Sequence, residues 1–281
     1  MARLTILMPL KTFHPPHLEQ ALGSIGRQTS PDWRLSIIVE PADLERFGPM
    51  LAEHLADPRV GLIASEGRRL AGALNTGMQA ATTEFVAILL ADDMWAPDAV
   101  AVLTRSMKLR PEVDFFHSSR QVIDGDGAPI SSIQWSREVA SPKDFESTSP
   151  AKHLLCWRAS AGISAGGMDE SLNSVGPDDW DFPWTMAERG AVFSAVNECL
   201  YLYRDHRDCY RLTTHLPLSH HKREIRRIMR KHGVDRRTIK ARVARAESAY
   251  LRQCFYRSRF DKWLKERLNH VPSRVWRESY R

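Results

Sequence analysis

Short apolar runs alternate with stretches of helical spacing along the first hundred residues. Strands are predicted at residues 4–8, 34–39, 60–64 and 85–90, and helices at 18–25, 44–55 (interrupted at 48–49) and 69–81. The run 85–90 is almost unbroken, which is typical of a central strand covered on both faces. Strands that alternate with helices at this spacing predict parallel βαβ units, and therefore an α/β fold.

Two adjacent carboxylates, Asp92 and Asp93, follow the last of these strands, and Pro97 opens another predicted helix. The carboxyl end of a buried strand is where open α/β sheets bind their ligands. Because neighbouring negative charges repel, a cation is their natural partner, and oxygen ligands suit Mg²⁺ or Mn²⁺, the usual companions of phosphate. The alternative is a pair of acids that only caps the helix that follows.

The alternation ends after Pro97. Further strands are predicted at 115–117, 120–124 and 198–203, with a turn at 124–127 and a mobile loop at 141–150 beside a pocket. A helix is predicted to open at 176–181 and to run to residue 189, and basic helices follow from about residue 215. No apolar run approaches the roughly 18 to 20 residues that a membrane span needs, and the first residues have the pattern of a strand rather than a signal peptide.

Charge is distributed unevenly along the chain. Residues 1–205 carry 18 Lys and Arg against 27 Asp and Glu, whereas residues 206–281 carry 22 against 7. An acidic body with a basic tail indicates two functions in one chain. The four cysteines show neither paired nor zinc-binding spacing, which predicts reduced thiols and a cytoplasmic location.

Several short motifs occur in one order over roughly residues 3–206. They are the strand 4–9, the helix 18–29, the strand end 37–40, and the segments 73–77, 91–93, 166–170, 178–181 and 203–206. With this set the chain resembles family 2 glycosyltransferases of the GT-A fold, which move a sugar from a nucleotide-diphosphate donor to an acceptor. The resemblance implies a mostly parallel, Rossmann-like sheet flanked by helices. It divides the chain into a GT-A domain (1–205, with a nucleotide-sugar half at 1–97 and an acceptor half at 98–205) and a basic helical extension (206–281).

The resemblance also implies roles for individual residues. Asp92 and Asp93 occupy the metal-binding motif, with His206 as a further candidate ligand of Mn²⁺ or Mg²⁺; a histidine that stabilises a loop is the alternative. Asp179 occupies the position of the general base near the acceptor, and its alternative role is a helix N-cap. The residues expected to contact the nucleotide sugar are Pro9, Phe13, Glu40, Asn75, Asp92 and Arg204, although ion pairs with Asp205 or Asp208 also explain the arginine.

The chain departs from the family pattern at several positions. Leu90 stands where another acid is common, Glu40 replaces Asp, and Pro41 replaces a second acid. Lys11 stands near the usual tyrosine, for which Phe13 is the candidate substitute. These changes leave the identity of the donor nucleotide (UDP, GDP or dTDP) undetermined and also permit a weakened metal site.

The basic tail has an apolar stripe at Ile225, Ile228 and Met229 and a second apolar run over 250–268. Such helices either pack the stripe on the parent domain or contact an anionic membrane at its inner face. No recognition motif supports nucleic-acid binding.

We therefore predict an inverting, metal-dependent glycosyltransferase of cell-envelope or polysaccharide biosynthesis, acting on a glycan, lipid-linked or protein acceptor. The alternatives are a degenerate domain that binds a sugar nucleotide or glycan without turnover, and a sugar-nucleotide pyrophosphorylase.

Overall fold

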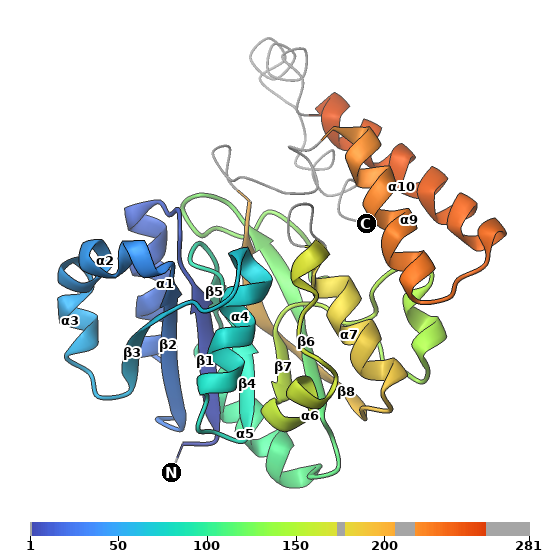
Figure 1. Cartoon of the computed structure of the whole chain (residues 1–281). Coiled ribbons are helices and arrows are strands. Elements are labelled where there is room, and N and C mark those ends of the chain that lie inside the picture. Colours follow the sequence, from blue (N-terminus) through green and yellow to red (C-terminus); the bar gives the residue numbers. More distant parts are fainter. Residues whose placement is uncertain (1, 173–177, 206–216, 257–281) are drawn as a thin grey trace.

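A computed structural model describes residues 2–172, 178–205 and 217–256 (Figure 1). Eight strands form one sheet in the order β3-β2-β1-β4-β7-β6-β8-β5. Their bounds are β1 Leu4–Pro9, β2 Trp33–Val39, β3 Val60–Ala64, β4 Phe85–Ile88, β5 Met94–Trp95, β6 Phe115–Ile123, β7 Leu155–Arg158 and β8 Phe193–Arg204. The first four strands are parallel, so their carboxyl ends lie along one edge.

The second half of the sheet is mixed. Strand β7 runs antiparallel to both β4 and β6, while β6 and β8 are parallel over nine register pairs with a bulge near Ser119. The two strands predicted at 115–117 and 120–124 are therefore one continuous strand. The sequence pattern is irregular at residues 118–119 because the strand has a bulge there, not because it ends.

Helices cover both faces of the sheet. They are α1 Pro15–Gly26, α2 Leu44–Met50, α3 Ala52–Leu55, α4 Arg69–Ala80, α5 Ala99–Leu109, α6 Ala159–Ser164, α7 Asp178–Glu188, α9 Leu218–Lys231 and α10 Arg236–Tyr256, with 3₁₀ turns at Pro41–Asp43, Pro142–Phe145 and Glu170–Leu172. The predicted interruption at 48–49 is wrong, because Pro49 lies inside α2 and the break comes at Leu51.

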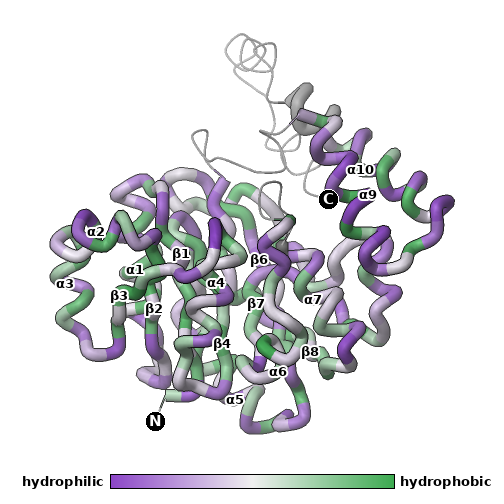
Figure 2. The backbone as a smooth tube through the Cα atoms, viewed as in Figure 1, coloured by the Kyte–Doolittle hydropathy of each residue, from purple (hydrophilic) through white to green (hydrophobic). Residues whose placement is uncertain are grey.

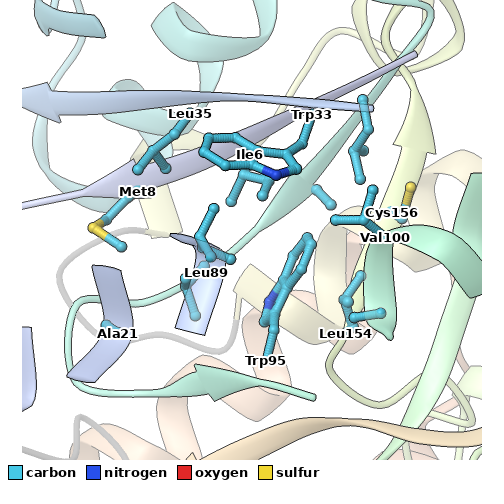
Figure 3. Close-up of a cluster of buried hydrophobic side chains, with 14 of the residues drawn as sticks. Ile6, Met8, Ala21, Trp33, Leu35, Leu89, Trp95, Val100, Leu154 and Cys156 are labelled. Carbon is cyan, nitrogen blue, oxygen red and sulfur yellow. The ribbon is translucent and has the colours of Figure 1, made fainter. Parts of the chain in front are cut away.

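Alternate residues of each strand enter two different apolar clusters. On β1, Leu4, Ile6 and Met8 join one cluster and Leu7 joins the other, as a strand covered on both faces requires. Figure 3 shows part of the first cluster, in which Trp33 and Trp95 pack around the aliphatic side chains of the central strands.

The basic helices α9 and α10 pack against the rest of the protein beside α7 (Figure 1). The stripe residues Ile225, Ile228 and Met229 are buried in the second cluster together with Trp180 and Trp184 of α7. Figure 2 shows hydrophilic and hydrophobic residues interspersed along both helices. The apolar stripe therefore packs on the parent domain, and most of the charged residues of these helices lie at the surface, with Glu224 as a buried exception. In the described ranges, no helix is long and apolar enough to span a bilayer.

Candidate functional site

The acidic pair follows β4 at the edge where the parallel strands end. Asp93 donates its backbone N–H to the carbonyl of Leu90 at 3.2 Å, which closes a turn between β4 and β5. At the same edge, Pro9 ends β1 and Glu40 follows β2. The fold therefore gathers Pro9, Glu40 and the acidic pair along one edge of the sheet.

The two carboxylates have different environments. Asp92 is half-buried, whereas Asp93 is 1% exposed. The Asp93 carboxylate accepts hydrogen bonds from the Tyr201 hydroxyl and from the Arg204 backbone N–H, both at 2.6 Å. Burial, with the neighbouring charge of Asp92, raises the pKa of Asp93 well above its usual value, although these two hydrogen bonds oppose the shift.

The Arg204 guanidinium lies behind this turn and is fully buried. It donates to the backbone carbonyls of Asp92 (2.6 Å), Asp124 (3.0 Å) and Gly125 (2.8 Å), and to the side chain of Gln20 (2.6 Å). One side chain thus ties the acidic turn to α1 and to the turn after β6. Its predicted contact with the nucleotide sugar stays a prediction.

The predicted nucleotide contacts near β1 and β2 have partners of their own. Lys11 and Glu40 form an exposed ion pair at 2.5 Å. The Phe13 ring packs 5.6 Å from the ring of Phe47, at the border of the first apolar cluster. Lys11 therefore places an ammonium group beside the acid that was predicted to reach the base.

Asn75 holds a glycine-containing segment against α4. Its side chain accepts a hydrogen bond from the Met168 N–H at 2.8 Å and donates to the Met168 carbonyl at 3.0 Å and to Glu170 at 3.4 Å. Gly167 has φ +73°, and a Cβ there would lie 2.6 Å from the Asn75 side-chain oxygen. Another residue here would displace the Asn75 side chain and would adopt a left-handed backbone conformation that favours glycine.

Asp179 lies in the first turn of α7 with 47% of its side chain exposed. Its carboxylate is 4.0 Å from Nδ1 of His153. Burial, together with the charges of Arg120 and Lys152, lowers the pKa of His153 to about 4, although the charge of Asp179 opposes this shift. The imidazole at neutral pH is therefore an uncharged neighbour of the carboxylate.

His153 connects Asp179 to the acidic turn. Its ring lies 5.2 Å from the ring of Tyr201, whose hydroxyl binds Asp93 and accepts the Leu90 N–H at 3.3 Å. Neither His153 nor Tyr201 was identified from the sequence, because no motif marks them and their partners are far away along the chain.

The remaining predicted residues have different positions. Asp181 is buried, and its carboxylate binds Lys231 at 2.7 Å and His232 at 3.0 Å, so it joins α7 to the C-terminal helices. His206 lies outside the described residues. Across the ranges that the structure describes, no group of three or more His, Cys, Asp or Glu side chains forms a metal cage.

Comparison with known proteins gives the family. The model of "Glycosyl transferase family 2" matches residues 5–161, more than half of the chain. The chain belongs to this family. The prediction of a family 2 glycosyltransferase is thus confirmed at the level of the family, and the matched range includes the acidic turn, Asn75 and His153.

Curated relatives of this family match parts of the chain. The O-antigen biosynthesis protein RfbC of Myxococcus xanthus is 24% identical over 208 residues, 72% of this chain and 16% of its own length. The succinoglycan biosynthesis protein ExoW of Rhizobium meliloti is 34% identical over 119 residues, 38% of this chain and 34% of its own. The chain therefore spans about a third or less of the length of these two relatives.

Solved structures resemble the whole chain. S. aureus TarS 1-349 aligns with a TM-score of 0.60 at 13% identity, covering 98% of this chain and 77% of its own. The mannosyltransferase PcManGT from Pyrobaculum calidifontis, in complex with GDP-Man and Mn2+, aligns with a TM-score of 0.60 at 19% identity, covering 99% and 84%. This likeness confirms the predicted GT-A fold with its C-terminal helices.

Proposed function

We propose that this family 2 chain transfers a sugar from a nucleotide-diphosphate sugar to an acceptor hydroxyl, with inversion and with Mn²⁺ or Mg²⁺. One observation carries the proposal. The half-buried Asp92 and the half-exposed Asp179 belong to one connected group of side chains, through His153, Tyr201 and Asp93. A site of this kind has one carboxylate for the donor and another for the acceptor.

On the donor side, Asp92 supplies the carboxylate that faces the cation, and His206 is the proposed second ligand. Magnesium commonly uses one or two carboxylates with substrate phosphates and water rather than a cage made of protein alone, so the described residues fit it. The cation would neutralise charge on the departing diphosphate. Asp93 stays a predicted ligand, and the two hydrogen bonds that its oxygens accept would in addition position the acidic turn.

The donor itself would lie along the edge formed by Pro9, Phe13, Glu40 and Asn75, with Arg204 behind it. Similar structures support a nucleotide sugar, since TarS was solved with UDP and with UDP-GlcNAc and PcManGT with GDP-Man. Which nucleotide and which sugar the donor carries are therefore the first questions to test.

On the acceptor side, Asp179 is proposed to take the proton of the attacking hydroxyl. An alcohol is a poor nucleophile until a positioned base accepts its proton. The neighbouring His153 is uncharged at neutral pH, so it does not compete as a cationic partner for that carboxylate. Exposure of the Asp179 side chain leaves room for an acceptor.

We place the reaction in polysaccharide or cell-envelope biosynthesis. The relatives RfbC and ExoW, and the Escherichia coli diphosphoundecaprenol glucosyltransferase WfgD, which is 26% identical over 126 residues, are named for such pathways or acceptors. The acceptor is then a glycan or a lipid-linked glycan, and a protein acceptor is less well supported.

Calorimetry with UDP, GDP and dTDP sugars, each with and without Mn²⁺, tests the donor site. We expect the sugars of one nucleotide to bind only when the metal is present. Without an acceptor, the protein should hydrolyse that donor slowly and release the nucleoside diphosphate. Binding without release would favour a catalytically degenerate domain, which is suggested by Leu90 in place of an acid. Absence of binding to every donor would contradict the proposal.

We also propose that the outer surface of α9 and α10 contacts an anionic membrane at the inner face. Eight exposed basic residues lie on the described part of these helices: Arg223, Arg227, Arg230, Lys231, Arg236, Arg237, Lys240 and Arg245. Co-sedimentation with phosphatidylglycerol vesicles, but not with phosphatidylcholine vesicles, should occur and should weaken as salt rises from about 0.1 M to 1 M. Equal behaviour with both lipids would contradict this contact.

A further inference from the structure

Basic side chains from distant parts of the chain lie near Asp179 and the residues next to it. Lys152 directly precedes His153, the neighbour of Asp179, and Arg242 of α10 lies with its guanidinium 5.2 Å from the ring centre of Trp180. Arg242 thus contacts the residue that follows Asp179, and Lys152 lies near enough to both Asp179 and Arg242 for their charges to shift its pKa.

Neither cation forms a close ion pair with an acid of the described residues. The ammonium of Lys152 donates to the backbone carbonyl of Ser149 at 2.9 Å. Nε of Arg242 is buried and has no hydrogen-bond acceptor among the described residues. Within the same ranges, neither side chain forms an ion pair with a carboxylate within 4.0 Å.

Two more arginines add to the positive charge. Arg120 of β6 lies 4.8 Å from the ring centre of Tyr203 and donates through Nε to Gln134 at 3.0 Å. Arg137 is exposed, and its backbone N–H binds the carbonyl of Pro150 at 3.2 Å, near the loop that carries Lys152.

The electrostatics agree with this grouping. Burial, together with the charges of Arg120, Arg137 and Arg242, lowers the pKa of Lys152 to about 8, and the charge of Asp179 opposes that shift. Several like charges held near one half-exposed carboxylate destabilise a fold, since each repels the others in a partly buried environment. An anionic ligand would remove that cost.

We propose that the acceptor carries an anionic group, a phosphate or a carboxylate, which Lys152 and Arg242 bind beside the hydroxyl that Asp179 activates. The inference rests on the proposed function and specifies the substrate class of the same site. A guanidinium suits this task because it donates two parallel hydrogen bonds to one phosphate or carboxylate. The basic extension would then contribute a residue to the acceptor site.

The test uses the full chain with the donor site saturated by Mn²⁺ and the nucleoside diphosphate that binds best. Inorganic phosphate and glucuronate are titrated by calorimetry, with glucose as the neutral control. The variants are Arg242→Gln and Lys152→Gln, and the matched control is Lys240→Gln, an exposed residue two positions before Arg242 on the same helix. Far-ultraviolet circular dichroism verifies that each variant is folded.

We expect phosphate or glucuronate to bind, and each site variant to weaken that binding at least about fivefold, roughly 1 kcal/mol. Glucose should not bind, and Lys240→Gln should retain the affinity of the unmodified protein. The anion that binds with the higher affinity indicates whether the acceptor carries a phosphate or a carboxylate.

Two results would overturn the inference. Anion binding that disappears when the nucleoside diphosphate is added would assign these cations to the donor. Anion binding that is absent, or equal in all variants, would show that the cluster is not an anion site. Nucleotide affinity is measured first, so failure of the proposed function is seen before the anion is tested. If no nucleotide binds, the anion titrations are carried out on the free protein.

Discussion

The hydroxyl of Tyr201 donates a hydrogen bond to the buried carboxylate of Asp93 at 2.6 Å. The two residues are 108 positions apart, and the same hydroxyl accepts the backbone N–H of Leu90. A side chain of the late strand β8 therefore holds the turn that follows β4. That turn determines where Asp92, the proposed metal ligand, points.

Replacing Tyr201 should loosen this turn. Tyr201→Phe removes a hydrogen bond to a buried carboxylate, which should lower the free energy of unfolding in urea by about 2 kcal/mol. Asp93→Asn disturbs the same contact, so the double variant should lose less than the sum of the two single losses. Strictly additive losses would mean that the two side chains act independently.

Asp92→Asn tests the metal site. The side chain is half-buried and keeps its shape, so the free energy of unfolding should stay within about 0.5 kcal/mol. Affinity for Mn²⁺ in the presence of the nucleoside diphosphate should fall, and turnover should fall at least tenfold, about 1.4 kcal/mol of barrier. Unchanged Mn²⁺ affinity and turnover would remove Asp92 from the site.

Asp179→Asn separates a general base from a helix cap. Asn caps a helix about as well as Asp but cannot take a proton, so transfer should be largely lost. Donor affinity should stay within about twofold, roughly 0.4 kcal/mol, because the donor does not need this carboxylate. Transfer rate and donor affinity are measured on the same preparation, with the adjacent Asp178→Asn as control. Retained transfer would make Asp179 a cap and would leave Asp178 or Asp181 as the base.

Asp181→Ala tests the attachment of the C-terminal helices. It removes a buried carboxylate shared by Lys231 and His232, which keep only the more exposed Asp169 and Glu188 as partners, and this should cost about 3 kcal/mol of unfolding free energy. Hydrogen exchange in α9 should accelerate. Glu247→Gln, which breaks the more exposed pair with Lys222, is the control and should cost less than about 1 kcal/mol. Equal costs would contradict the special role of Asp181.

His117 should make the protein sensitive to acid. The ring is fully buried, and burial with the charge of Lys152 lowers its pKa to about 4. The pKa of a histidine in an unfolded chain is about 6.5. Between about pH 6.5 and pH 4 the unfolded chain therefore binds a proton that the folded protein does not. The free energy of unfolding falls over this interval as pH falls, by on the order of 3 kcal/mol.

His117→Leu should remove this contribution and make urea stability less dependent on pH over that interval. A smaller dependence should persist, because His153 has a pKa lowered to about the same value. An unchanged pH profile would show that His117 does not remain neutral in the folded protein.

The sequence alone was enough to predict the α/β class and the positions of the acidic pair and of Asp179. Strand and helix periodicity is a local property, and a strand such as β4 that is apolar on both faces must lie inside a sheet. Acids directly after that strand must then lie at its carboxyl edge. These conclusions depend only on residues that are neighbours in the chain.

Tertiary structure alone decided how those residues differ in environment. Asp93 is buried, whereas Asp92 is only half-buried, because the Tyr201 hydroxyl and the Arg204 backbone N–H, from more than a hundred residues away, bind the carboxylate of Asp93. Likewise, Arg242 reaches Trp180 because the apolar stripe of α9 is buried beside α7. Burial and pairing depend on which distant segments pack together, and packing is a property of the whole fold that local periodicity does not contain.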